Sequence, residues 1–201
     1  MIRFFALVVC LYAGPLWAEG ANVTVEGGTA TFVVNTTVPG ISVKGKSAAL
    51  QAHALVEREG GTLRLDKVEA TMPVKSILTG MALRDEHMRR YIFTTSDGKT
   101  PDLRFEAPGV ACGPQGEHSS AVTCQVKGEL SIRGLSRPFS IPLKIHADGS
   151  AYRATGEAIV KLSDYGIEQP SQFGVKTSNE IQLHLEFNAK PSAGVIAAGG
   201  R

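Results

Sequence analysis

Two neighbouring stretches of the chain alternate between apolar and polar residues. From Val122 to Ile132, and again from Phe139 to Ile145, every second residue is apolar or glycine. A period of two over this length predicts β-strands with one buried and one solvated face, as in an antiparallel sheet. A short turn of Gly, Ser, Arg and Pro joins the two runs, so we expect a β-hairpin from Val122 to Ile145. Pro142 has no N–H, and we expect a gap in the hydrogen-bond ladder there.

Similar patterns predict strands along most of the chain. Within 41–57 and 62–74 the apolar phase changes once, which indicates a bulge or strong bend in each strand. Ser76–Tyr91 is the one segment with helical spacing of its apolar and charged residues. Helices are too few to cover a parallel sheet, so we expect an all-β fold, either a sandwich or a closed barrel. The phase shifts of the long strands favour closure, so we expect a single antiparallel barrel of about eight strands with one short α-helix.

The N-terminal residues have the pattern of a secretory signal peptide. Met1–Arg3 form a basic start, Phe4–Tyr12 is an apolar run, and small residues lead to Ala18. The apolar run is about half of the ~20 residues that a membrane span needs, which makes a transmembrane anchor the weaker interpretation. We expect a signal peptide at 1–18, a barrel domain at 19–190 and a flexible C-terminal tail at 191–201. The mature protein would be periplasmic or secreted.

The charge balance gives little guidance about partners. Loss of Arg3 with the signal peptide lowers the formal net charge from +2 to +1. This value gives no electrostatic case for a nucleic acid or for an anionic membrane surface. No basic cluster is interleaved with aromatic residues, so nucleic-acid binding is not expected. Stable membrane insertion is not expected either.

Two cysteines remain after Cys10 leaves with the signal peptide. In an exported protein, Cys112 and Cys124 predict one disulfide. It would close a loop of about a dozen residues and stabilise the fold by about 3 kcal/mol in the chain-entropy model. Two free thiols or half of a metal site are the alternatives, although no CxxC spacing supports a metal.

Four motifs, in order along the chain, resemble the YceI-like family of polyisoprenoid-binding domains over about residues 29–189. They are ILTGMALRDEHMRR at 77–90, the segment FTTSDGKTPDLRF with Phe93, Pro101 and Phe105, GELSIRGLSRPFSIP at 128–142, and SDYGI at 163–167. The resemblance implies a lipocalin-like barrel that is exported and holds a long isoprenoid or another amphiphilic lipid inside, without catalysis. It implies no cofactor other than such a lipid.

With this resemblance, the apolar face of the late strands becomes the expected lining of a lipid cavity. Small residues at inward positions, namely Gly128, Ala154, Gly156 and Ala158, predict room inside. We expect Arg84 and Tyr165 at the cavity mouth. The expected wall consists of Leu130, Ile132, Phe139, Ile141, Leu143, Leu183, Leu185 and Phe187.

Other interpretations stay open. The protein could be a structural or interaction protein with a solid barrel core. Asp85 and His87 could serve an enzyme that acts on a small hydrophobic substrate, but the other histidines are too scattered for a metal site. We favour a structural role in which Arg84 and Asp85 fix the helix to the barrel rim. Edge strands left by imperfect closure would let two copies pair, so a homodimer is an alternative to a monomer.

Overall fold

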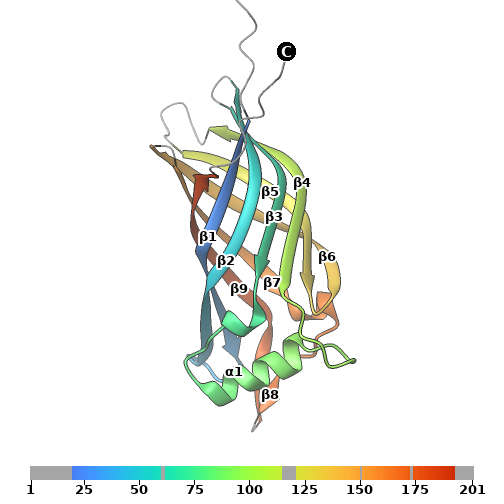
Figure 1. The fold of residues 1–201 in the computed structure, drawn as a ribbon. Helices are drawn as coiled ribbons and strands as arrows, with labels where there is room; N and C mark the ends of the chain where they lie inside the picture. Colours follow the sequence, from blue (N-terminus) through green and yellow to red (C-terminus); the bar gives the residue numbers. More distant parts are fainter. Residues whose placement is uncertain (1–19, 60–61, 115–120, 150, 173, 193–201) are drawn as a thin grey trace, which may run out of the picture.

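The computed structural model describes residues 20–59, 62–114, 121–149, 151–172 and 174–192 and folds them into an antiparallel barrel (Figure 1). Strands that follow each other in the chain are neighbours in the sheet from β1 to β7, β9 pairs with β7, and pairing of β1 with β9 closes the barrel. This confirms the expected eight-stranded barrel, beside which β8 pairs only with β9. The strands are β1 (Ala21–Thr36), β2 (Ser42–Glu59), β3 (Thr62–Met72), β4 (Leu103–Pro114), β5 (Ala121–Ile132), β6 (Leu135–Asp148), β7 (Ala151–Lys161), β8 (Ser171–Gln172) and β9 (Val175–Pro191).

The β5–β6 hairpin follows the predicted alternation. Its register is continuous from Ala121 opposite His146 to Ile132 opposite Leu135. Arg133 and Gly134 have positive φ angles of 55° and 76° and form a two-residue turn that matches the twist of the strands. The expected turn of Gly, Ser, Arg and Pro is therefore shorter, and residues 135–138 belong to β6.

The expected gap at Pro142 is found on one side of β6. Pro142 keeps its place opposite Gln125 of β5. On the other side, the β6–β7 register begins at Asp148 opposite Ala151 and ends at Leu143 opposite Gly156. Beyond this pair, the described residues of β6 and β7 do not pair with each other, so the barrel wall is interrupted there.

The predicted phase changes coincide with irregular pairing. The β2–β3 register shifts between His53 and Leu55, and Lys67 of β3 has a positive φ of 49°. The β1–β2 register shifts on both sides of Gly28. These irregularities move the apolar residues of the long strands back to the inner face, as the bulge hypothesis expects.

One helix of two parts lies across an end of the barrel, which we call the helix end (Figure 1). It comprises α1 (Ala82–Met88, 7 residues) and the π-helical turn η2 (Arg89–Phe93, 5 residues). The predicted start at Ser76 is too early, because Leu78 exchanges two backbone hydrogen bonds of 2.9 Å with Lys46 of β2. No helix in the described part of the chain is long and apolar enough to cross a membrane.

Two 3-10 turns complete the helix end. They are η1 (Val74–Ser76) between β3 and α1, and η3 (Leu162–Tyr165) directly after β7. The side-chain oxygens of Ser76 and Ser47 lie 2.6 Å apart and tie η1 to β2. The helix end is thus built from segments that are far apart in the sequence.

The opposite end of the barrel carries the predicted disulfide. Cys112 and Cys124 are bonded across β4 and β5, their Cα atoms lie 4.4 Å apart, and both are fully buried. The ends of β1 and β9 meet here, where the N–H of Ser192 donates to the carbonyl of Asn22 over 2.9 Å. β9 includes Pro191, the first residue of the expected tail. The expected signal peptide and residues 193–201 lie outside the described residues.

Candidate functional site

The barrel interior is packed as two clusters of apolar side chains. The disulfide-end cluster surrounds Cys112 and Cys124 and includes Val126. The helix-end cluster includes Val74, Phe93 and Tyr165 and contacts the helix. Alternation along each strand directs every second side chain into one of these clusters.

All eight predicted wall residues point into the barrel. Ile141 and Leu143 belong to the disulfide-end cluster, and Leu185 and Phe187 pack against it. Ile132 belongs to the helix-end cluster, Leu130 and Leu183 pack against that cluster, and Phe139 contacts both. Their position on the inner face follows from the alternation, whereas their contact with a ligand stays a prediction.

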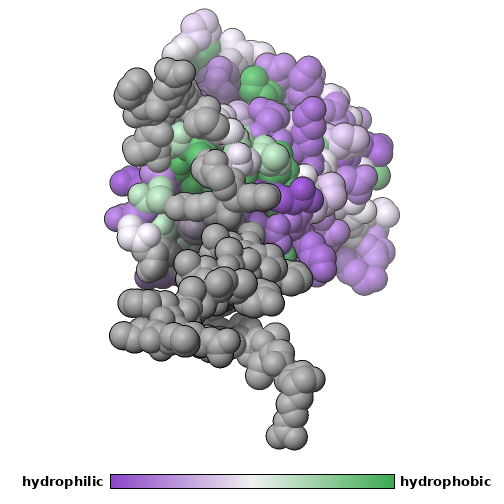
Figure 2. Space-filling view, turned by 90° about the horizontal axis from the view of Figure 1, so that it is seen from above, coloured by the Kyte–Doolittle hydropathy of each residue, from purple (hydrophilic) through white to green (hydrophobic). Residues whose placement is uncertain are grey.

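Several of these inward side chains are only half-buried. They are Leu130, Phe139, Leu183, Leu185 and Phe187. By contrast, the side chains of the disulfide and of Val126 are at most 1% exposed. Close packing would bury an inward residue completely, so the barrel is less tightly filled along β5, β6 and β9 than around the disulfide. Seen from the disulfide end, hydrophobic residues show in the middle of the molecule and hydrophilic ones around them (Figure 2).

The inward glycines contribute less room than the sequence indicates. A Cβ atom at Gly128 would lie 2.1 Å from the carbonyl oxygen of Glu106, and one at Gly156 would lie 2.6 Å from the Leu143 side chain. These positions allow a close approach of neighbouring strands rather than open space. Any cavity therefore depends on the half-buried apolar residues.

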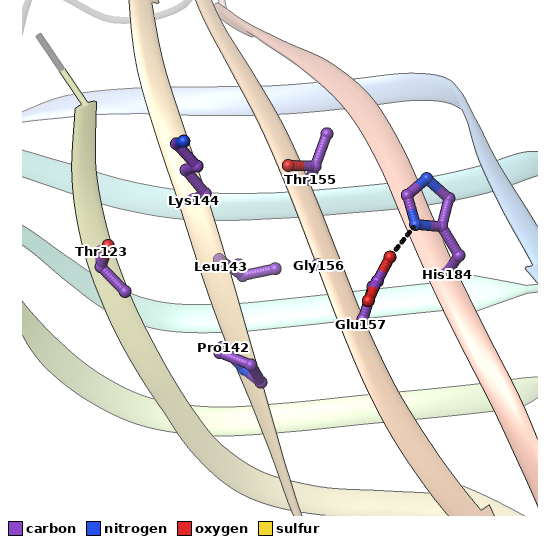
Figure 3. Close-up of a pocket in the computed structure, with 8 residues that line it drawn as sticks. All are labelled: Thr123, Pro142, Leu143, Lys144, Thr155, Gly156, Glu157 and His184. Carbon is purple, nitrogen blue, oxygen red and sulfur yellow. Dashed lines mark hydrogen bonds and ion pairs between the residues drawn. The ribbon is translucent and has the colours of Figure 1, made fainter. Parts of the chain in front are cut away.

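A pocket of about 270 Å³ opens in the outer wall where β6 and β7 part. Figure 3 shows the two strands diverging past Pro142 and Glu157. Leu143 and Gly156 lie at the last paired position of these strands, and Nδ1 of His184 lies 3.3 Å from Oε1 of Glu157 at the rim. The remaining lining residues are Thr123, Lys144 and Thr155.

A second pocket, of about 450 Å³, marks the other irregular seam. It lies where the β1–β9 register shifts between Thr24 and Thr29, and Phe187 is its aromatic lining residue. Both pockets therefore combine a side chain of the inner face with polar residues of the outer face. Alternation within single strands did not predict them, because each depends on the pairing of two strands.

Arg84 of α1 lies beside Thr79, which belongs to the segment that leads into the helix. The Nε of Arg84 donates to Oγ1 of Thr79 over 2.8 Å, and its Nη2 donates to the Thr79 carbonyl over 2.6 Å. Thr79 in turn donates from its N–H and its hydroxyl to the Asp85 carboxylate, at 2.7 and 2.5 Å. Because Leu78 is paired with β2, these bonds attach the helix to the barrel, as the structural interpretation expects.

Asp85 is buried but stays ionised. Burial raises the pKa of its carboxyl, but the hydrogen bonds from Thr79 and the positive charges of Arg89 and Arg84 outweigh burial and hold the pKa below its ordinary value. Among the described residues, the buried Nε of Arg89 has no hydrogen-bond partner. Sequence periodicity could not identify Thr79 as the partner of Asp85, because their contact requires the chain to fold back before the helix.

Tyr165, the second expected mouth residue, is buried in the helix-end cluster at the end of η3. Burial raises the pKa of its phenol to about 12, the neighbouring Asp164 carboxylate adds to this increase, and Arg137 opposes it. Arg137 also donates from Nε to the Asp164 carbonyl over 2.8 Å, which connects η3 to β6.

His87 contacts an aromatic neighbour on the same helix. Its ring lies edge-on to Tyr91 with centroids 6.0 Å apart. The described residues include no group of three or more His, Cys, Asp or Glu side chains that could hold a metal ion. Among the described residues, Asp85 and His87 therefore do not belong to a cluster of three or more such side chains.

Comparison with known proteins shows the family to which the chain is similar. A family model for the YceI-like domain matches residues 21–189. The chain is 32% identical over 126 residues to a UPF0312 protein of Pseudomonas paraeruginosa, a match that covers 60% of each chain. It is also 32% identical over 108 residues to a UPF0312 protein of Serratia proteamaculans, with 51% of this chain and 52% of that protein covered. The matched region thus spans about 60% of the length of the first of these relatives.

Solved structures share the fold at low sequence identity. A polyisoprenoid-binding domain from Saccharophagus degradans, implicated in plant cell wall breakdown, superimposes with a TM-score of 0.63 at 12% identity and covers 87% of this chain and 100% of its own. BcnA of Burkholderia cenocepacia gives a TM-score of 0.60 at 17% identity, covering 80% and 95%. The YCEI protein of Campylobacter jejuni gives 0.59 at 18% identity, covering 77% and 88%.

Proposed function

The chain belongs to the YceI-like domain family, and on this premise we propose that it is an exported protein that holds a lipid inside its barrel. The ligand is a polyisoprenoid, a quinone-like lipid or a fatty amphiphile, and the protein acts as its carrier or store in the periplasm. The description of the Saccharophagus degradans domain as polyisoprenoid-binding supports this ligand class.

One structural observation carries the proposal. Five apolar side chains of β5, β6 and β9 point inward and yet stay half-buried, so they have apolar surface left to cover. A hydrocarbon chain laid against them would gain about 0.8 kcal/mol for each CH₂ group that leaves water. Such binding needs no directional bonds, and its selectivity depends on the length of the cavity.

The proposal is binding without catalysis. The Asp85 carboxylate already accepts two hydrogen bonds from Thr79, and this arrangement fits a structural anchor better than a proton-transfer group. The ring of His87 packs against the ring of Tyr91. Turnover of a small hydrophobic substrate that disappears in His87→Ala, with the fold intact, would contradict this part of the proposal.

The test is mass spectrometry of the native protein released from its own periplasm by osmotic shock. We expect the protein in the periplasmic fraction, with a bound mass that organic extraction removes and that fragmentation identifies as a lipid. Recovery of the protein only from the cytoplasm would contradict export, and a clean mass of the bare chain would contradict lipid binding.

A pair of variants locates the ligand. Leu130→Trp adds volume inside the barrel at a half-buried position, whereas Lys127→Trp adds it on the outer face of the same strand. We expect the first variant to lose the bound lipid and the second to keep it, both with unchanged circular dichroism. Equal lipid content in the two variants would place the ligand outside this part of the barrel.

A solid core that serves a structural or interaction role is the second candidate. It is favoured by the positions of Gly128 and Gly156, where neighbouring strands occupy the space that a side chain would take. This candidate predicts the bare mass in the experiment above and no effect of the Leu130→Trp substitution other than on stability.

A further inference from the structure

The helix end of the barrel exposes large apolar side chains. Leu78, Met81, Leu83 and Tyr91 are between 52% and 62% exposed. Leu83, His87 and Tyr91 follow one another at intervals of four residues and therefore share the outer face of the helix. The opposite face, with Asp85 and the residues that join the helix-end cluster, packs on the barrel. The solvent side of this helix therefore carries large apolar side chains, which a surface helix usually keeps buried.

Basic side chains lie near this apolar face. Lys46 lies directly opposite Leu78 in the bridge between β2 and the segment before α1, and Lys44 lies two residues away on the same side of β2. Lys75 belongs to η1, and the guanidinium of Arg90 lies 5.8 Å from the centre of the Tyr91 ring. All four are exposed, and none forms an ion pair with a described residue.

Acidic groups near this face are largely engaged. Asp85 is buried against Thr79, and Asp102 accepts a hydrogen bond from the N–H of Val74. Asp97 pairs with Lys99 over 2.9 Å. Glu86 of α1 and Asp164 of η3 are the further exposed carboxylates of these segments. The nearly neutral net charge of the whole chain is therefore compatible with a local excess of positive charge at this end.

We propose that the helix end is a docking surface for an anionic phospholipid bilayer, with Leu78, Met81, Leu83 and Tyr91 among the lipids and Lys46 and Arg90 beside the headgroups. An apolar face with a basic rim is the pattern by which peripheral proteins bind membrane surfaces. Tyr and Arg suit the boundary, since each combines an apolar body with a polar tip. The proposal does not depend on whether the barrel interior holds a lipid.

The test uses tryptophan fluorescence. Trp17, the only tryptophan of the sequence, lies in the expected signal peptide, so the chain from residue 19 has none. Leu83→Trp places a reporter on the proposed surface, and Ile159→Trp places a matched one at an apolar position of β7 that is 55% exposed. Each variant is mixed with phosphatidylglycerol vesicles at low salt, and with phosphatidylcholine vesicles as the neutral control.

We expect the emission of Leu83→Trp to shift to the blue only with phosphatidylglycerol vesicles, and this shift to disappear in 0.5 M salt. The emission of Ile159→Trp should stay unchanged. In the Leu83→Trp background, Arg90→Gln should weaken binding about fivefold, since a basic residue near an anionic surface contributes about 1 kcal/mol. Lys144→Gln, on the outer wall, should have no effect. No shift with phosphatidylglycerol, an equal shift with the neutral vesicles, or an equal shift of the two reporters would overturn the proposal.

Discussion

Cys112 and Cys124 face each other across β4 and β5 at the end of the stretch over which these two strands lose regular pairing. The β4–β5 register is interrupted between Glu106 and Gly113, and the disulfide lies beside the first restored pair, Gly113 opposite Thr123. A Cα separation of 4.4 Å is typical of directly opposed residues without mutual hydrogen bonds. The covalent bond therefore fastens two strands where the backbone ladder does not.

Loss of this bond should reduce stability. We expect the double variant Cys112→Ala, Cys124→Ala to lower the free energy of unfolding by about 3 kcal/mol, because the unfolded chain regains the entropy of an open loop. Chemical denaturation measures the difference. Reducing agent should destabilise the wild type and leave the double variant unaffected. If the wild type were equally insensitive under conditions that reduce the bond, the disulfide would have no stabilising role.

Asp85 should make the fold sensitive to acid. Its pKa is lower in the folded state than its ordinary value of 3.8, so its contribution to stability is complete above about pH 4 and disappears as the pH falls through the folded pKa. Asp85→Asn should flatten this part of the stability–pH curve, measured by denaturation between pH 2 and pH 7. At neutral pH, loss of the charged acceptor should cost about 2 kcal/mol.

The matched control for Asp85 is Glu86→Gln, which changes an exposed carboxyl of the same helix. It leaves the hydrogen bonds from Thr79 to Asp85 in place, so the Asp85 component of the curve should remain. An acid limb that is unchanged in Asp85→Asn would mean that other carboxyl groups dominate the acid response.

Tyr165 should affect stability at the alkaline end. Burial raises its pKa from 10.0 to about 12, so the stabilisation associated with the neutral phenol is complete below pH 10 and is lost as the pH rises through 12. The absorbance of tyrosinate follows this ionisation directly. We expect Tyr165→Phe to lack the component that titrates near pH 12 in the wild type, and to lose less stability than the wild type between pH 10 and pH 12.

A methyl group at Gly128 should strain the barrel. The Cβ of Gly128→Ala would lie 2.1 Å from the Glu106 carbonyl oxygen, so the strands must separate, at a cost of about 1–3 kcal/mol. Gly113→Ala is the matched control. Gly113 lies on β4, the strand next to β5, and nothing lies within 4 Å of its Cβ position. Thermal unfolding of the two variants provides the comparison, and equal unfolding temperatures would be incompatible with the close approach at Gly128.

Local patterns predicted most of the barrel because they report what one strand does. The alternation in β5, β6 and β9 identifies Leu130, Phe139 and Leu183 as inward residues, since side chains of a strand take opposite faces in turn. The phase change before Val68 predicted the irregularity at Lys67 for the same reason. Both features are properties of a short segment and need no knowledge of its neighbours.

Features that require two distant segments could not be read in this way. The helix begins later than its periodicity predicts because Leu78 pairs with Lys46, a contact across 32 positions of the chain. The pocket beside Leu143 exists because β6 and β7 part, and the burial of Tyr165 depends on how η3 folds against the helix-end cluster. The fold had to form before any of these could be described.

The hydrogen bond between Ser192 and Asn22 brings the two ends of the described barrel together at the face opposite the helix. A short linker between these positions, with new termini opened at the Arg133–Gly134 turn, would give a circular permutant with every strand pair of the barrel unchanged except the hairpin connection. The same geometry means that both attachment points for a fusion partner or an immobilising tag lie at the end of the barrel opposite the helix. A protein tethered there would keep the helix end free of the attachment site.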